Sequence, residues 1–302
     1  MRIAIFGSGG VGGYFGARLA ATGNEVHFLA RGAHLRAMRE HGLRVESALG
    51  NLQITAHAHE RPEEIGPVDY VVFAVKLADV EGAAAQLRPL LQQHTVVLCF
   101  QNGVEAAEIV ARAIGPQNVR PGVAYIATAI STPGVVRHTG TMQRLQVGQG
   151  AERFVAACKE AGINIEQAED IERARWEKFV FLAALSGVTS VARAPVGVCR
   201  ADPELRATFE AAMTEAWRLG RKRGVRLAED FIADRMKFLE GLPAEMRTSM
   251  QHDLEAGKPL EAAWLCGAVV RMSAHAGLEA PVNRTLYAAL KPFLHGTAGA
   301  PR

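Results

Sequence analysis

The chain has 302 residues, of which 49% are hydrophobic and 22% are charged, values typical of a globular protein without a disordered, highly charged tail. Its formal net charge of +3 is too small and too evenly spread to favour nucleic-acid binding, although it would not repel an anionic ligand. The four cysteines lie far apart and lack the spacing of a zinc site, so we expect buried, reduced thiols and no metal site.

The length and the first residues narrow the class of protein further. A chain of 302 residues favours two domains of roughly 150 residues each, with a cleft between them. An apolar run begins at Ile3, which leaves no room for a secretory signal, and the longest apolar stretch, residues 179–188, is too short to span a membrane. We therefore expect a cytoplasmic location and no membrane partner.

Short apolar, β-branched runs alternate with helix-like segments in the first half, which is typical of a parallel sheet with crossover helices. Residues 42–56 alternate around Gly50-Asn51 and predict a hairpin at the sheet edge, and residues 134–148 predict a further strand pair. The expected fold class is α/β, with an N-terminal doubly wound sheet of Rossmann type. The other predicted strands cover residues 2–6, 25–30, 69–75, 95–100 and 119–127.

The second half is predicted to be helical. From about Ile171 onward the density of β-branched residues falls, and residues 204–220 and 260–276 carry apolar residues at three-and-four spacing. The polar stretch 167–172 opens a long helix. We therefore place a nucleotide-binding domain at residues 1–168 and a helical substrate and catalytic domain at residues 169–302.

A glycine-rich loop follows the first predicted strand and precedes a predicted helix that ends at Gly23. In the GxGxxG pattern the first glycine permits a tight turn, the second lets the backbone approach a pyrophosphate, and the third lets helix and strand pack closely. The N–H groups of the first helical turn then face the phosphate charge. The alternative is a glycine turn with a purely structural role. The loop consists of Gly7, Ser8, Gly9, Gly10, Val11 and Gly12.

The end of the second predicted strand indicates which nicotinamide cofactor binds. An Asp or Glu there would bind a ribose 2′-hydroxyl and repel a 2′-phosphate. This chain has Arg31 at that place, with no acid beside it in the sequence, so NADP is the expected cofactor. The alternative is a solvated surface arginine.

Polar residues at the ends of two later strands are further candidates, because ligands of open α/β sheets bind beyond the carboxyl ends of the strands. Lys76 ends the apolar run 71–75, and Asn102 ends the run 96–100. Asn102-Gly103 is also an ordinary turn pair, so this residue has a structural alternative.

Lys178 heads an almost wholly apolar helical stretch in the second half. A lysine that faces such a surface loses solvation, which lowers its pKa and makes it a better proton donor near neutral pH. The alternative is that the aliphatic stem covers apolar surface while the ammonium reaches water.

Along nearly its whole length the chain resembles the ketopantoate reductases (2-dehydropantoate 2-reductases). The resemblance depends on landmarks that occur in order across both predicted domains. They are the loop 7–12, Arg31, Val75-Lys76, Asn102-Gly103, Lys178 after Trp176, Ser249-Met250 followed by Asp253, and Glu261.

The resemblance implies a role for each landmark. NADPH would lie on the glycine loop with Arg31 at its 2′-phosphate, and the keto acid would bind between the two domains. Lys178 would hydrogen-bond the keto oxygen and protonate it as hydride reaches the carbon. Lys76 and Asn102 would contact the nicotinamide side of the cofactor and the substrate. Ser249 would bind the substrate carboxylate, and Glu261 would take part in the hydrogen-bond network of the lysine and the substrate hydroxyl. Without the resemblance, Glu261 would be a favourable acid in a first helical turn.

The chain departs from the family pattern in the substrate pocket. Many relatives carry asparagines one and two turns after the lysine, where this chain has Leu182 and Ser186 in the same row of the helix. Leucine cannot hydrogen-bond a hydroxyl, so the identity of the keto acid substrate is left undetermined.

The expected activity is NADPH-dependent reduction of ketopantoate to pantoate in pantothenate (coenzyme A) biosynthesis. The alternatives are reduction of another small 2-keto acid and a non-catalytic NADP-binding module. A homodimer is the default expectation.

Overall fold

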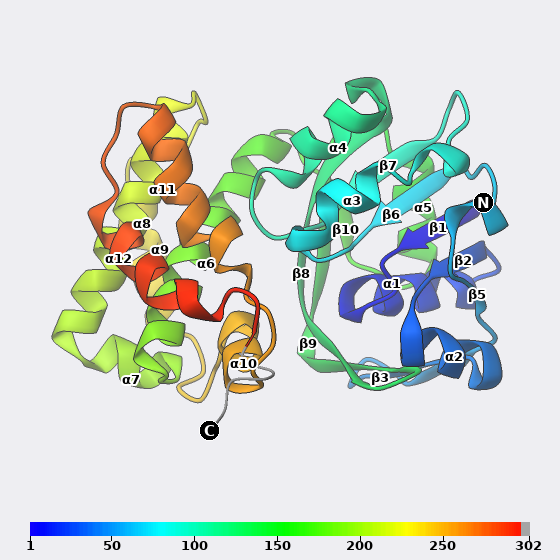
Figure 1. The fold of residues 1–302 in the computed structure, drawn as a ribbon, viewed down its shortest axis with the longest axis horizontal. Coiled ribbons are helices and arrows are strands. Elements are labelled where there is room, and N and C mark those ends of the chain that lie inside the picture. The colour runs from blue at the N-terminus through cyan, green and yellow to red at the C-terminus, as the bar shows by residue number, and fades with distance from the viewer. Residues whose placement is uncertain (297–302) are drawn as a thin grey trace. The chain divides into compact units, whose positions relative to one another are not determined.

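The computed structural model describes residues 1–296, which form two compact units (Figure 1). The first unit comprises residues 1–174, and the second begins at Arg175. Within residues 1–296, every helix is too short or too polar to traverse a lipid bilayer.

A twisted sheet forms the first unit, coloured blue to green in Figure 1. Its strand order is β4-β3-β9-β8-β7-β6-β1-β2-β5, and β10 pairs with β9 outside this path. The strands β7, β6, β1, β2 and β5 are mutually parallel, so their carboxyl ends meet at one edge. The bounds are β1 (Arg2–Phe6), β2 (Glu25–Leu29), β3 (Leu43–Glu46), β4 (Leu52–Ile54), β5 (His57–His59), β6 (Tyr70–Phe73), β7 (Val96–Cys99), β8 (Val119–Thr132), β9 (Val135–Val147) and β10 (Ile165–Gln167).

The predicted doubly wound sheet and edge hairpin are confirmed. The antiparallel pair β3–β4 forms the hairpin and lies at one end of the strand order. Strand β8 continues to Thr132, beyond the predicted end at residue 127, because β9 returns alongside it as an antiparallel partner. The strand pair predicted at residues 134–148 is wrong, since β9 is one continuous strand there. The short edge strand β5 was not predicted, since its three residues His57–His59 lack an apolar run.

Helices connect the parallel strands and cover their apolar faces. The largest fully buried side chains of this unit include Phe28, Tyr14 and Phe15, which form one core with β1, β2 and β9. The helices are α1 (Gly10–Ala21), α2 (Gly32–His41), α3 (Val80–Ala84), α4 (Ala106–Ile114) and α5 (Glu152–Glu160), with the single 3-10 turns η1 (Pro62–Glu64), η2 (Leu77–Asp79), η3 (Arg88–Leu90) and η4 (Pro116–Asn118).

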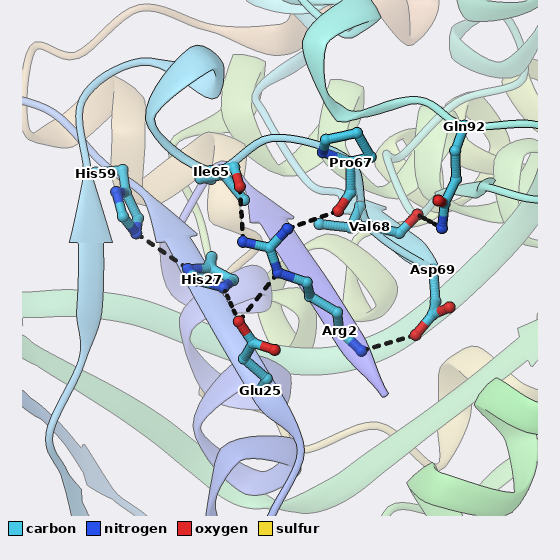
Figure 2. Close-up of polar contacts among 9 residues, drawn as sticks. All are labelled: Arg2, Glu25, His27, His59, Ile65, Pro67, Val68, Asp69 and Gln92. Atoms are coloured by element: carbon cyan, nitrogen blue, oxygen red, sulfur yellow. Dashed lines mark hydrogen bonds and ion pairs between the residues drawn. The ribbon is translucent and has the colours of Figure 1, made fainter.

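A polar network ties together the amino ends of β1, β2 and β6 (Figure 2). The guanidinium of Arg2 donates to Glu25 Oε1 (3.0 Å) and to the carbonyls of Pro67 and Ile65, each at 2.7 Å. The Arg2 backbone N–H donates to Asp69 Oδ2 at 2.8 Å. These groups satisfy one another at the amino ends, whereas ligands of open α/β sheets bind beyond the carboxyl ends of the strands.

Within residues 175–296 the regular elements of the second unit are all helices, the first of which, α6, begins at the end of the first unit. The ring of the half-buried Phe181 makes edge-to-face contacts with the buried Phe209 and with Phe238, which is 45% exposed. The nearly buried carboxylate of Glu215 accepts hydrogen bonds from the backbone N–H groups of Val282 (2.8 Å) and Asn283 (2.9 Å) at the start of α12. The elements are α6 (Ile171–Ala192), α7 (Val196–Ala201), α8 (Pro203–Lys222), α9 (Phe231–Glu240), α10 (Ser249–Glu255), η5 (Glu261–Trp264), α11 (Cys266–His275), α12 (Pro281–Leu290) and η6 (Lys291–Phe293).

Two sequence predictions about these helices need correction. Residues 260–276 do not form one helix, because the backbone leaves helical angles at Leu265 (φ −109°, ψ −102°) and separates η5 from α11. Lys178 does not head its helix either, since α6 begins at Ile171 and places Lys178 in its interior. The predicted helix at residues 204–220 is present as α8, and all four cysteines are buried, free thiols, as expected.

Candidate active site

The glycine loop is fixed to the carboxyl ends of the two strands that flank β1. Gly7 has a φ of +101°, and a Cβ there would lie 2.7 Å from the backbone nitrogen of Val75, just after β6. On the other side, the backbone N–H and the hydroxyl of Ser8 both donate to the carbonyl of Leu29, at 3.0 and 2.9 Å. The turn after β1 therefore requires glycine both for its φ value and for space.

The remaining glycines of the loop differ in what surrounds them. A Cβ at Gly12 would lie 2.3 Å from the Gly7 carbonyl oxygen, and one at Gly10 would lie 2.5 Å from the carbonyl oxygen of Thr128 in β8. At Gly9, by contrast, no atom of the other described residues lies within 4 Å of such a Cβ, apart from those of its two chain neighbours. The first turn of α1 carries no acidic side chain. The backbone is thus open at Gly9, where the N–H groups of α1 can receive an anion.

His34 connects this loop to two other parts of the first unit. The Gly134 N–H, in the turn between β8 and β9, donates to His34 Nδ1 at 3.0 Å, and His34 Nε2 lies 2.9 Å from the Ser8 carbonyl oxygen. Because Nδ1 accepts, the imidazole is neutral and Nε2–H donates to Ser8. Burial lowers the pKa of His34, and the bond to the Ser8 carbonyl opposes that shift. His34, which lies on α2, therefore holds the glycine loop through its neutral imidazole.

Arg31, directly after β2, forms an ion pair with Asp79 of η2, with 2.7 Å between Nη2 and Oδ2. The sequence shows no acid beside Arg31, and the tertiary structure supplies one. Strands β6 and β2 both pair in parallel with β1, so segments 48 residues apart meet at the same sheet edge. The side chain of Arg31 is 81% exposed, which leaves it accessible to a ligand.

Lys76 follows the carboxyl end of β6, which pairs with β1, and Asn102 follows the carboxyl end of β7, which pairs with β6. Lys76 is exposed and Asn102 is half-buried. The preceding Gln101 donates to the Phe73 carbonyl oxygen at 2.9 Å, which ties the segment after β7 to the end of β6. The fold thus gathers the loop 7–12, Arg31, Lys76 and Asn102 at one edge of four adjacent strands.

Lys178 is half-buried on α6, between the buried Trp176 and Phe179. Burial lowers the pKa of its ammonium to about 8, and the negative charge of Glu261 in η5 opposes this shift. An amine of this kind remains mostly protonated near neutral pH yet releases its proton more readily than an ordinary lysine. Lys178 can therefore serve as a proton donor, with the carboxylate of Glu261 stabilising its protonated form.

The row that continues from Lys178 along α6 is partly polar. Leu182 is half-buried, and Ser186 is 1% exposed with a hydroxyl that has no hydrogen-bond partner among the described residues. Further along, the Thr189 hydroxyl lies 3.3 Å from that of Thr248, the residue before α10. Ser249 is the first residue of α10 and is exposed.

The structure therefore groups the predicted residues in two sets. The nucleotide candidates gather in the first unit, while Lys178, Glu261, Ser186 and Ser249 belong to the second. Asp79 and His34 were not predicted from the sequence. The position of Asp79 three residues after Lys76, at a strand end, was the one signal for it, whereas His34 in a polar helical stretch gave none.

Comparison with known protein families matches both units. The family model described as Ketopantoate reductase PanE/ApbA matches residues 3–152, and that described as Ketopantoate reductase PanE/ApbA C terminal matches residues 170–293.

Individual relatives match over nearly the whole chain. An uncharacterized oxidoreductase, YkpB of Bacillus subtilis, is 30% identical over 97% of this chain and 99% of its own. The 2-dehydropantoate 2-reductase of Mesorhizobium japonicum is 32% identical over 89% of this chain and 90% of its own. The crystal structure of a PanE/ApbA family ketopantoate reductase from Ralstonia eutropha has a TM-score of 0.91 at 32% identity and covers 97% of this chain and 98% of that one.

Proposed function

This chain belongs to the ketopantoate reductase family, and from that premise we propose that it reduces a small 2-keto acid, ketopantoate, to pantoate with NADPH as hydride donor. The family makes the chain an oxidoreductase. The observation that supports a proton-donating role in this reduction is the half-buried Lys178 on α6, whose pKa burial lowers to about 8 against the opposing charge of Glu261. We further propose that this reaction serves pantothenate (coenzyme A) biosynthesis.

The first unit fits a nicotinamide dinucleotide. The open backbone at Gly9 leaves room for a pyrophosphate, and the α1 N-terminus has no acidic side chain in its first turn to repel one. Arg31 is exposed at the end of β2, where it can pair with a 2′-phosphate. When bound, the dihydronicotinamide supplies a hydride to the keto carbon.

Lys178 performs the proton step in this proposal. Its Nζ holds a proton at neutral pH and would donate it to the keto oxygen. The carbonyl π bond is then replaced by a C–H bond to the hydride and an O–H bond to this proton, while the C–O single bond remains. The positive charge also stabilises the negative charge that develops on this oxygen. The carboxylate of Glu261 favours the protonated amine, which keeps the donor loaded. We assign nucleotide binding to the first unit and proton donation to the second.

The remaining candidates bind the substrate. We assign Ser249 to the substrate carboxylate, Asn102 to the substrate and nicotinamide, and the buried hydroxyl of Ser186 to a substrate hydroxyl. Lys76 completes the positive edge at which the nucleotide lies.

A second candidate substrate follows from Leu182, which presents no hydrogen-bonding group between Lys178 and Ser186. A pocket with this apolar position recognises a hydroxylated keto acid less strictly than one with an amide there. The same machinery would then serve a small 2-keto acid without the hydroxyl of ketopantoate.

Steady-state kinetics with NADPH and a panel of 2-keto acids test both candidates. The panel should include ketopantoate and trimethylpyruvate, which lacks only the substrate hydroxyl. We expect the highest kcat/KM for ketopantoate, and a clear preference for another acid would replace the first candidate by the second. Leu182→Asn should raise the preference for ketopantoate over trimethylpyruvate about tenfold, since one hydrogen bond is gained. Leu182→Met, which keeps the position apolar, should leave the ratio unchanged.

A further inference from the structure

The ion pair between Arg31 and Asp79 bridges the two strands on either side of β1. Arg31 follows β2, Asp79 follows β6 by way of η2, and β1 between them leads directly into Gly7. The pair, with its 2.7 Å contact, thus lies at the sheet edge where the glycine loop begins. Any ligand group that binds Arg31 also approaches the carboxylate of Asp79.

Asp79 is the better fixed member of the pair. Its backbone N–H donates to the Lys76 carbonyl oxygen at 2.9 Å, and the side chains of Leu77 and Val80 near it are 1% and 0% exposed. Its own side chain is 46% exposed, against 81% for Arg31. The short aspartate is therefore held in place beside the guanidinium of Arg31.

The carboxylate has opposite consequences for the two nicotinamide dinucleotides. A 2′-phosphate must share Arg31 with Asp79 and is repelled by its negative charge, whereas a ribose 2′-hydroxyl can donate a hydrogen bond to a carboxylate. We propose that Asp79 is a specificity-determining residue, which weakens the preference of the nucleotide site for NADP(H) and allows NAD(H) to bind. This inference rests on the proposed function, because it assumes that the site holds a nicotinamide dinucleotide.

The ion pair could instead have a purely structural role. The melting temperature does not distinguish the two roles, because an ion pair between exposed side chains contributes little to folding and its removal should leave the melting temperature unchanged in both cases. Only a role in specificity changes the relative affinity for nucleotides with and without a 2′-phosphate.

The test is calorimetric titration of the full chain with NADP⁺ and NAD⁺ at low ionic strength, for the wild type and Asp79→Asn. We expect Asp79→Asn to raise the ratio of the NAD⁺ to the NADP⁺ dissociation constant about fivefold, an effect that shrinks with added salt. Asp79→Glu should restore most of the wild-type ratio. Glu81→Gln, which removes the same charge from an exposed neighbour in α3, should change the ratio less than twofold.

The possible results separate this inference from the proposed function. An unchanged ratio in Asp79→Asn, or an equal change in Glu81→Gln, overturns the role of Asp79. If neither nucleotide binds the wild type, the nucleotide site itself is wrong and both proposals fail. If the ratio rises as expected but no 2-keto acid is reduced, Asp79 keeps its role and the reductase assignment fails.

Discussion

Lys178 could place its ammonium in water above an apolar stem or bring it into the apolar surroundings of α6, and the two arrangements differ in pKa. An ammonium in water keeps an ordinary pKa, because nothing removes its hydration. Burial in this chain lowers the pKa to about 8 despite the opposing charge of Glu261. The half-buried position of Lys178 beside the buried Trp176 and Phe179 supports the desolvated arrangement, which is the one that suits a proton donor.

Replacement of this amine should abolish the proton step and spare nucleotide binding. We expect Lys178→Ala to lower kcat by about 10²–10⁴-fold, the usual contribution of a general acid, while the dissociation constant of NADP⁺ stays within about twofold. Steady-state kinetics and calorimetric titration provide the two readouts. Lys237→Ala, which removes an exposed lysine from α9 of the same unit, should leave both unchanged. Undiminished turnover in Lys178→Ala would show that another group donates the proton.

The same residue predicts the pH dependence of the reduction. Only the protonated amine can donate, so kcat should fall as the pH rises through about 8, the lowered pKa of Lys178. Lys178→Arg keeps its charge well above that pH, so any residual activity should lose this decline. A rate that stays constant between about pH 7 and 9.5 in the wild type would contradict the assignment.

At the scale of an element, the glycines of the GxGxxG loop are required for different physical reasons. Gly12 is required by the fold, because a Cβ there would lie 2.3 Å from the Gly7 carbonyl oxygen. Gly9 is not required by the fold, since its surroundings are open and its φ of −76° suits any residue. We propose that a ligand occupies this space.

These two glycines give a matched pair of variants. Gly12→Ala should lower the free energy of unfolding by about 1–3 kcal/mol, because the backbone must shift to admit a methyl group. Gly9→Ala should leave the unfolding free energy within about 0.5 kcal/mol of the wild type and weaken NADP⁺ binding at least tenfold. Chemical denaturation and calorimetric titration measure the two effects. Full affinity in Gly9→Ala would mean that no phosphate approaches this backbone.

At the scale of the whole molecule, the two units have separate cores and separate optical probes. The core of the first unit is built from residues between Ile3 and Ile165. All three tryptophans, Trp176, Trp217 and Trp264, belong to the second unit. Tryptophan fluorescence therefore reports on the second unit, whereas far-ultraviolet circular dichroism reports on both.

Nucleotide binding should stabilise the two units unequally. NADP⁺ at about 100 times its dissociation constant adds about 2.7 kcal/mol to the state that binds it. We expect this to raise a circular-dichroism transition that belongs to the first unit, while the tryptophan transition of the second unit shifts less. Thermal scans of the full chain with both probes, with and without NADP⁺, make the comparison. Equal shifts in both probes would show that the units unfold as one cooperative body.

The sequence by itself determined the features that depend on local patterns. Periodic apolar runs predicted the strands of the sheet, and glycines at fixed spacing after β1 predicted the phosphate loop, because both signals lie within a few neighbouring residues. Only the tertiary structure decided which distant groups meet. It brought Asp79 to Arg31 and placed His34 between Ser8 and Gly134. It also divided the predicted helix 260–276 at Leu265. These features arise from strand order and packing between segments far apart in the chain, which no local pattern encodes.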